Sequence, residues 1–243
     1  MDLNSLSLQE TQRFLVTVLC LCAVQVMDGL RRRTRVPQPP APRRKDGRAV
    51  QIWAREWLTQ RQLVCQAIND IYKPEVMKCP KTPEGWNDVA KHFASKWNYF
   101  NCVGALDGKH IAIKKPKGGG SQYFSYKKFH SIVLMSLSDA KYKFLLVDVG
   151  AGGGAGDGRT WQKCNLARVI PNNRAGLSQD RNLPNDNEPI PFHIVTDEAF
   201  ALNTWLMKPY SHQSQDPTEQ IYSYRLSRAR RVVENALSLL QMR

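Results

Sequence analysis

Apolar positions follow two different periods along the chain. Between residues 50 and 99 they recur at intervals of three and four, as in Val50–Leu58 and Leu63–Ile71, which is the period of amphipathic helices. Thr82 and Pro83 predict the start of another helix, because threonine caps helices and proline suits the first helical position. We expect this helix to bury Trp86, Val89, Ala90, Phe93 and Trp97. The pattern predicts a helical segment over residues 50–99.

After Cys102 the apolar residues form short, nearly continuous runs, which are typical of buried strands. Strands are predicted over 103–113, 131–137, 143–149 and 192–196, with a hairpin turn at 138–141. Helices are predicted over 157–169 and 224–242, and a loop over 171–190. This alternation predicts a mixed α/β domain in which helices pack against a sheet.

The first 49 residues have a different composition. An apolar segment, residues 14–24, precedes a basic cluster, which is the reverse of a secretory signal. A short buried or amphipathic helix is therefore favoured over a cleaved signal or anchor. The prolines of residues 36–42 predict an extended linker. We expect residues 1–49 to be an apolar segment plus a basic, proline-rich linker, largely disordered. No apolar run reaches the roughly 18–20 residues that a membrane span needs, so no membrane partner is expected.

Composition and charge narrow the function. The chain has 243 residues, 42% hydrophobic and 23% charged, which excludes a collagen, a coiled coil and wholesale disorder. Its net charge of +14 predicts a polyanionic partner, with nucleic acid favoured over an acidic membrane surface. About half of that excess lies in residues 31–48, which fits a soluble tail, a nuclear-import signal or a DNA-contacting arm.

The 6 cysteines contain no C-x-x-C pair and no metal-ligand spacing with histidine. Free thiols in a reducing compartment are favoured over a disulfide framework, and zinc has no support.

Three carboxylates stand out by position. Asp107 ends the run Val103–Leu106, Asp197 follows the strand predicted at 192–196, and Glu234 lies in the final helix. Carboxylates at strand ends open into the crevice where α/β folds place their sites, and a convergent cluster needs a divalent cation to offset its repulsion. Each also has a structural interpretation, since Asp is a common turn residue and Glu234 can pair with Arg230 or Arg231. Other acidic candidates are Asp148, Asp157 and Glu198.

Basic side chains lie near these carboxylates. Glu234 is beside the expected packed stripe of its helix rather than opposite it, and the stripe is Leu226, Ala229, Val233, Leu237 and Leu240. Contacts to DNA phosphates are expected from Arg225, Arg228, Arg230, Arg231, Lys114, Lys115 and Lys117. The alternative is a solvated charged helix followed by a flexible loop.

A glycine-rich run, Gly150–Ala155, formally fits a dinucleotide-binding pattern after a strand. No acidic residue follows about 20 positions later, where the ribose contact belongs. Cofactor binding is therefore disfavoured.

Several motifs together resemble the PIF/Harbinger transposases and the nucleases derived from them. Trp97–Ile113 resembles the first catalytic block of that family, Val195–Leu202 with Trp205–Tyr210 the second, and Tyr224–Ala236 the third. The segments Tyr123–Ala140 and Phe144–Gly150 match the strands between these blocks, so the resemblance spans roughly residues 65–240.

The resemblance implies a ribonuclease-H-like DDE endonuclease domain over residues 100–243. Asp107, Asp197 and Glu234 would be its catalytic residues and its ligands for Mg²⁺ or Mn²⁺, with Asp157 as an auxiliary metal ligand. The implied activity is metal-dependent hydrolysis of DNA phosphodiester bonds in the nucleus. The alternative is a catalytically inactive, domesticated or decayed transposase that binds DNA or a protein there.

Two departures from the family pattern bear on this expectation. Residues 50–99 match only a reduced remnant of the family's N-terminal helical region, which favours a separate DNA-binding partner protein. The chain ends at Arg243, soon after Glu234, so the domain is expected to be truncated at its C-terminus and its activity can be lost.

Overall fold

The computed structural model describes residues 63–116, 120–164, 167–168, 170, 176–211 and 213–240. The chain forms two compact units that divide after Val76. In the first, residues 63–76 are helical, which confirms the helix predicted around Leu63–Ile71. The segment 1–49, the helix predicted at 50–58 and Lys117 lie outside the described residues.

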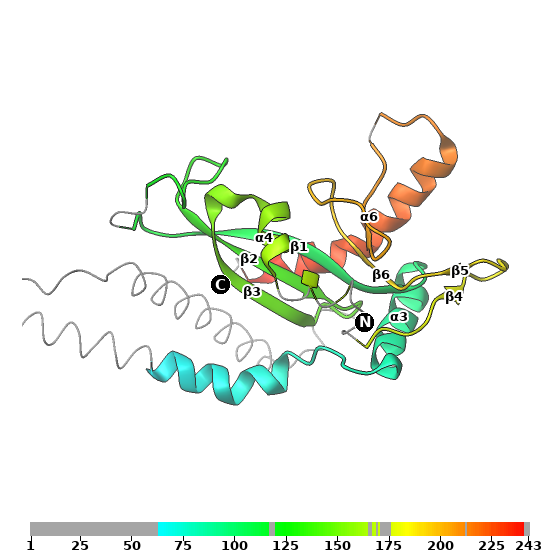
Figure 1. Cartoon of the computed structure of the whole chain (residues 1–243), viewed down its shortest axis with the longest axis horizontal. Helices are drawn as coiled ribbons and strands as arrows, with labels where there is room; N and C mark the ends of the chain where they lie inside the picture. The colour runs from blue at the N-terminus through cyan, green and yellow to red at the C-terminus, as the bar shows by residue number, and fades with distance from the viewer. Residues whose placement is uncertain are drawn as a thin grey trace, which may run out of the picture. The chain divides into compact units, whose positions relative to one another are not determined.

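The second unit is built on a five-stranded mixed sheet with strand order β3-β2-β1-β6-β7 (Figure 1). The strands are β1 (Cys102–Ala112), β2 (Ser131–Ser138), β3 (Phe144–Gly152), β6 (His193–Val195) and β7 (Leu206–Met207). The first three are antiparallel neighbours, whereas β6 pairs in parallel with both β1 and β7. Strand β1 is therefore the central strand, and the β2–β3 turn lies where the sequence predicts it.

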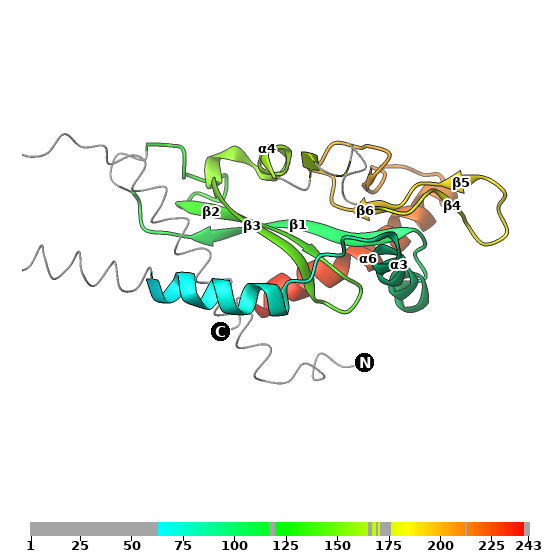
Figure 2. The same cartoon turned by 60° about the horizontal axis from the view of Figure 1, so that its bottom comes forward.

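Helices cover both faces of this sheet, which confirms the predicted α/β class. Figure 2 shows α3 (Pro83–Trp97) and α6 (Pro217–Leu239) on one face and α4 (Asp157–Lys163) on the other. A 3₁₀ turn, η2 (Gly153–Ala155), precedes α4, and β4 (Arg181–Asn182) and β5 (Pro189–Ile190) form a separate small hairpin. Among the described residues, no helix combines the length and the apolar composition that crossing a bilayer requires.

Local signals set the starts of the two long helices. Thr82 caps α3, since its Oγ1 accepts from Gly85 N at 3.3 Å, and Pro83 is the first helical residue as predicted. Asp216 caps α6 by accepting from Thr218 N at 2.8 Å. Helix α6 therefore begins at Pro217, well before the predicted start, because its first two turns are too polar to show an apolar stripe.

The buried faces of these helices largely follow the predicted stripes. In α3, Trp86, Ala90 and Phe93 are buried, while Val89 and Trp97 are half-buried. Helix α6 buries four of the five predicted positions and two more; its buried residues are Leu226, Ala229, Val232, Val233, Ala236 and Leu237. Leu240, the fifth predicted position, is half-buried.

Elements between β3 and α6 differ most from the sequence expectation. Helix α4 ends at Lys163 because Cys164 has an extended backbone (φ −66°, ψ 139°), whereas the pattern predicts helix to residue 169. The predicted loop over 171–190 contains β4 and β5, and its residues 171–175 lie outside the description. Strand β7 has only two residues, too few to produce a periodic signal.

The glycine run ends β3 and packs against the segment before β2. The backbone nitrogen of Gly154 donates to Gln122 O at 3.0 Å, and a Cβ on Gly152 would stand 2.5 Å from the same carbonyl oxygen. A Cβ on Gly153 would overlap the hydroxyl of Ser131. Close packing of backbone on backbone thus accounts for these glycines, and no nucleotide is needed to explain them.

We predict that Gly152→Ala destabilises the fold by about 1–3 kcal/mol, because its methyl group would meet a backbone carbonyl that cannot rotate away. Urea unfolding measures the change. Gly85→Ala is the control, since its nearest contact is the Pro80 side chain at 3.1 Å and alanine is favoured in a helix by about 1 kcal/mol. Equal stability of the two variants would contradict the packing argument.

A buried histidine lies where β6 begins. His193 Nδ1 donates to Pro191 O at 3.0 Å, and its Nε2 is buried without a hydrogen-bond partner among the described residues. The ring of Tyr99 packs edge-on against it, with centroids 5.6 Å apart. Burial lowers the pKa of His193 from its ordinary 6.5, so the native state holds this imidazole neutral.

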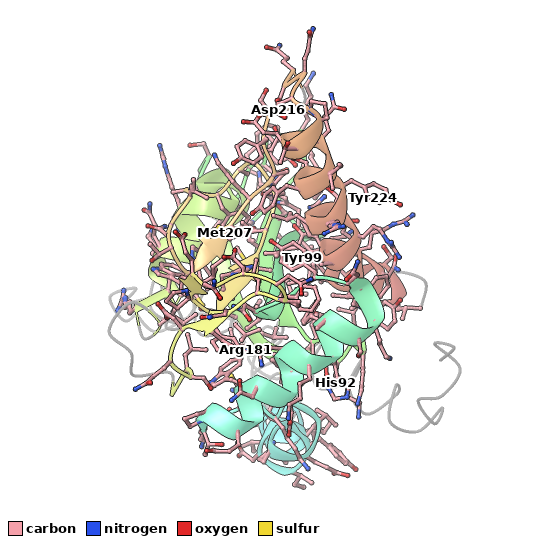
Figure 3. All side chains as sticks on the ribbon, turned by 90° about the vertical axis from the view of Figure 1, so that its right-hand side faces the viewer. His92, Tyr99, Arg181, Met207, Asp216 and Tyr224 are labelled. Atoms are coloured by element: carbon pink, nitrogen blue, oxygen red, sulfur yellow. The ribbon has the colours of Figure 1, made fainter. Side chains whose placement is uncertain are left out.

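We predict that this histidine makes stability fall as the pH drops below about 6.5, because the unfolded chain then binds a proton that the native state excludes. His193 lowers the free energy of unfolding by at most about 1.4 kcal/mol for each pH unit below about 6.5, and it adds no pH dependence above that value. Urea unfolding at pH 7.5 and 5.5 should show a smaller loss for His193→Gln than for wild type. His92→Gln, on the outer side of α3 (Figure 3), is the control; an unchanged loss in His193→Gln would refute the assignment.

Candidate functional site

The parallel pairing of β1 with β6 brings two of the predicted carboxylates to neighbouring positions. Ala105 is opposite Val195 in this ladder. The alignment continues for one more residue, since Thr196 Oγ1 donates to Leu106 O at 3.4 Å. Asp107 lies two residues after Ala105 within β1, and Asp197 lies two residues after Val195, just past the end of β6, so the pairing brings the chain at Asp197 next to the part of β1 that carries Asp107.

Backbone amides orient both carboxylates. Asp107 is half-buried, and its Oδ1 accepts from Gly108 N at 2.9 Å. Asp197 is also half-buried, and its Oδ1 accepts from Ala199 N at 3.0 Å in the turn that follows β6. Each carboxylate is therefore held by the backbone of a residue that follows closely in sequence, within β1 for Asp107 and in the turn after β6 for Asp197.

Glu234 comes to the same region on α6. Near its start, this helix is anchored by the Tyr99 hydroxyl, which donates to the Tyr222 hydroxyl at 3.5 Å beside the beginning of β1. Figure 3 shows Tyr99 between α3 and α6. Twelve residues of helix then advance the chain by about 18 Å, and α6 runs along β1 from the α3 end (Figures 1 and 2). Glu234 thus lies in the later part of the helix that packs on β1.

The Glu234 carboxylate is paired with an arginine. Its Oε1 lies 2.6 Å from Arg230 Nη2, one turn back, and 40% of the side chain is exposed. Among the described residues, no three His, Cys, Asp or Glu side chains stand close enough together to hold a metal ion. The β1–β6 pairing brings the chain segments of Asp107 and Asp197 together, and the Glu234 carboxylate is paired with Arg230.

The donor chemistry suits a hard divalent cation. Carboxylate oxygens are the ligands that Mg²⁺ prefers, and it keeps several waters, so two or three carboxylates suffice. Asp107, Asp197 and Glu234 fit this requirement in ligand type, although Glu234 is paired with Arg230 in this structure.

Other acidic candidates lie elsewhere. Asp157 is the first residue of α4, on the opposite face from α6, and its side chain lies outside the description. Asp148 is on β3, two strands away from β1, where it pairs with Met135. Glu198 is exposed in the turn after Asp197.

The predicted basic side chains form an exposed set on α6 and after β1. Arg225, Arg228 and Arg231 are exposed on α6, and Arg230 is half-buried. Lys114 and Lys115 are exposed just beyond β1. The Arg228 guanidinium lies 5.8 Å from the centroid of the Tyr224 ring, which is itself 64% exposed and points outward in Figure 3. The outer surface of α6 therefore combines positive charge with an exposed aromatic ring.

Sequence reasoning missed one feature of this region. A cavity of about 580 Å³ opens between α4 and the loop from Ala199 to Leu206, directly after Asp197. Trp161 and Trp205 lie in its wall, from segments that are remote in sequence. The tryptophans were visible in the sequence, but nothing there indicated that they meet.

Comparison with known proteins gives consistent matches. A family model described as "DDE superfamily endonuclease" matches residues 106–243. This range contains Asp107, Asp197 and Glu234. No solved structure matches the chain.

The similar curated proteins include animal and plant sequences. The proteins named "Putative nuclease HARBI1" from Rattus norvegicus and Homo sapiens are 26% and 27% identical to it over 138 residues, which is 57% of this chain and 35% of each relative. "Protein ALP1-like" from Arabidopsis thaliana is 23% identical over 163 residues, 66% of this chain and 40% of the relative. The chain thus spans a little over a third of the length of the relatives it matches.

Proposed function

Since the chain belongs to the DDE superfamily endonuclease family, we propose that it hydrolyses DNA phosphodiester bonds with a divalent metal held by Asp107, Asp197 and Glu234. The observation that supports the proposal is the β1–β6 register inside the matched region, because it pairs Ala105 with Val195, two residues before Asp107 and Asp197. The strongly basic chain suits a polyanionic substrate.

Each residue has a distinct part in this proposal. A bound Mg²⁺ or Mn²⁺ would make a water nucleophilic and stabilise the charge that develops on the phosphate. Asp107 and Asp197 supply oriented carboxylate oxygens, because Gly108 N and Ala199 N fix their directions. Glu234 would hold the ion in place of its present partner Arg230, whose guanidinium would then be available to a DNA phosphate.

The exposed arginines of α6 hold the DNA. Arg225, Arg228 and Arg231 lie on the helix that carries Glu234, so a duplex bound along α6 brings its backbone to the carboxylates. Such contacts are electrostatic and independent of base sequence.

We predict that Asp107→Asn, Asp197→Asn and Glu234→Gln each lower Mn²⁺-dependent nicking of plasmid DNA at least about 100-fold, because even residues that only support metal ligands are worth 10–100-fold. Calorimetry should show weaker Mn²⁺ binding in each variant. Asp88→Asn, an exposed carboxylate on α3 paired with Lys91 at 3.1 Å, should cut as wild type does.

Two outcomes would overturn this prediction. If Asp107→Asn and Asp197→Asn nick as fast as wild type, the metal assignment is wrong. If the wild-type protein binds duplex DNA with a steep salt dependence and never cuts it, a non-catalytic DNA-binding function replaces the nuclease.

We further predict that Arg225→Ala and Arg228→Ala each weaken duplex binding uniformly across sequences. The slope of log affinity against log salt should become shallower by about 1 per arginine, since each phosphate contact releases counterions. Fluorescence anisotropy over a KCl series measures the slope. Lys141→Ala, a change at an exposed residue of the β2–β3 turn, is the control and should leave the slope unchanged. If the slope is also unchanged in both arginine variants, α6 is excluded as the DNA surface.

Nuclear localisation and a separate DNA-binding partner protein complete the proposal. The basic cluster of residues 31–48 supplies the import signal. A fluorescent fusion lacking these residues should stay outside the nucleus, and continued nuclear accumulation would assign import to another segment or to the partner.

A further inference from the structure

The cavity beside Asp197 has an aromatic wall and a polar rim. Trp161 and Phe200 are buried, and Trp205 is half-buried, with its ring centroid 6.2 Å from that of Trp161. Three exposed side chains that can form hydrogen bonds stand at the rim; they are Arg159, Gln162 and Asn203. Its volume of about 580 Å³ is within the range of small-molecule sites.

This cavity is structurally joined to the candidate metal ligand. Ala199 lines the cavity, and its amide nitrogen donates to Asp197 Oδ1 at 3.0 Å. A Cβ on Gly158 would stand only 3.0 Å from Ala199 O, so the start of α4 lies against the same turn. An occupant of the cavity would therefore lie close to the C-terminal end of β6, which Asp197 follows.

The chemistry of the lining selects the class of occupant. Flat aromatic walls favour a planar ring, and base stacking on aromatic side chains is tolerant of sequence. The guanidinium and amide groups at the rim can hydrogen-bond the edge of a heterocycle. The lining contains one basic residue and no acidic residue, so it suits a ring that is attached to an anionic backbone.

We propose that this cavity receives one unpaired base of the DNA substrate, rotated out of the helical stack. The inference rests on the proposed function, since it takes DNA as the molecule that reaches Asp197. Captured between α4 and the loop from Ala199 to Leu206, the base holds the adjoining backbone near the carboxyl end of β6, where Asp197 follows the strand. The site thus favours DNA that is distorted or unpaired next to the cleaved bond, because extruding an unpaired base costs less.

The test compares two duplexes that differ in one group. Both carry a single unpaired nucleotide at the same position, one with its base and one abasic. Binding to the full chain is measured by fluorescence anisotropy in EDTA, so that neither metal nor cleavage contributes. Wild type should bind the duplex with the base about tenfold more tightly, in the range that stacking provides. With 2-aminopurine as the unpaired base, binding should also quench its fluorescence.

Variants assign this preference to the cavity. Trp205→Ala and Gln162→Ala should bring the two affinities together while leaving affinity for the abasic duplex unchanged. Gln162 is an exposed helical residue, so its variant tests the rim even if Trp205→Ala fails to fold. Arg228→Ala is the control and should weaken both duplexes equally.

Equal binding of the two duplexes by wild type would overturn the inference. A preference that survives in the cavity variants would place the base elsewhere. A preference that millimolar free nucleoside monophosphates abolish would make a free nucleotide the occupant of the cavity. Because the assay is metal-free, base capture with no cleavage would refute only the nuclease proposal, and cleavage without base preference would refute only the cavity assignment.

Discussion

The parallel pairing of β1 with β6 is the constraint on which the candidate site depends. It joins segments about ninety residues apart and sets Ala105 opposite Val195, two residues before Asp107 and Asp197. A slip of one residue would turn one carboxylate to the other face of the sheet. The burial of β1 between β2 and β6, with α6 packed along it, holds this register.

Electrostatics divides the site into two parts. One part is the pair of half-buried carboxylates, Asp107 on β1 and Asp197 just after β6, and the other is the arginine-rich helix α6, which packs on β1. The Arg230–Glu234 ion pair joins these parts, because Glu234 is a carboxylate on the arginine-rich helix and its charge is neutralised by Arg230, with Nη2 and Oε1 2.6 Å apart. A cation bound at Asp107 and Asp197 would compete with Arg230 for Glu234, which couples metal binding to the availability of a guanidinium for phosphate.

The loop after β6 extends this arrangement to the other side of the sheet. Its first residues bind the Asp197 carboxylate through Ala199 N, and it then buries Phe200 and Leu206 in the core beside α4. The cavity next to Trp205 is a consequence of that path. A candidate metal ligand and a candidate base site thus depend on one short connection, from Asp197 to Leu206.

Short-range information determined much of this protein from the sequence alone. Continuous apolar runs specify β1, β2 and β3, the Thr82–Pro83 pair starts α3, and the ordered motifs identify Asp107, Asp197 and Glu234 as the residues to examine. Tertiary structure decided what depends on distant partners. It set the parallel register, the two-residue strand β7, the early end of α4, the meeting of Trp161 with Trp205 and the Arg230 contact of Glu234. Periodicity reports which face of an element is buried, and it carries no information about which element covers that face.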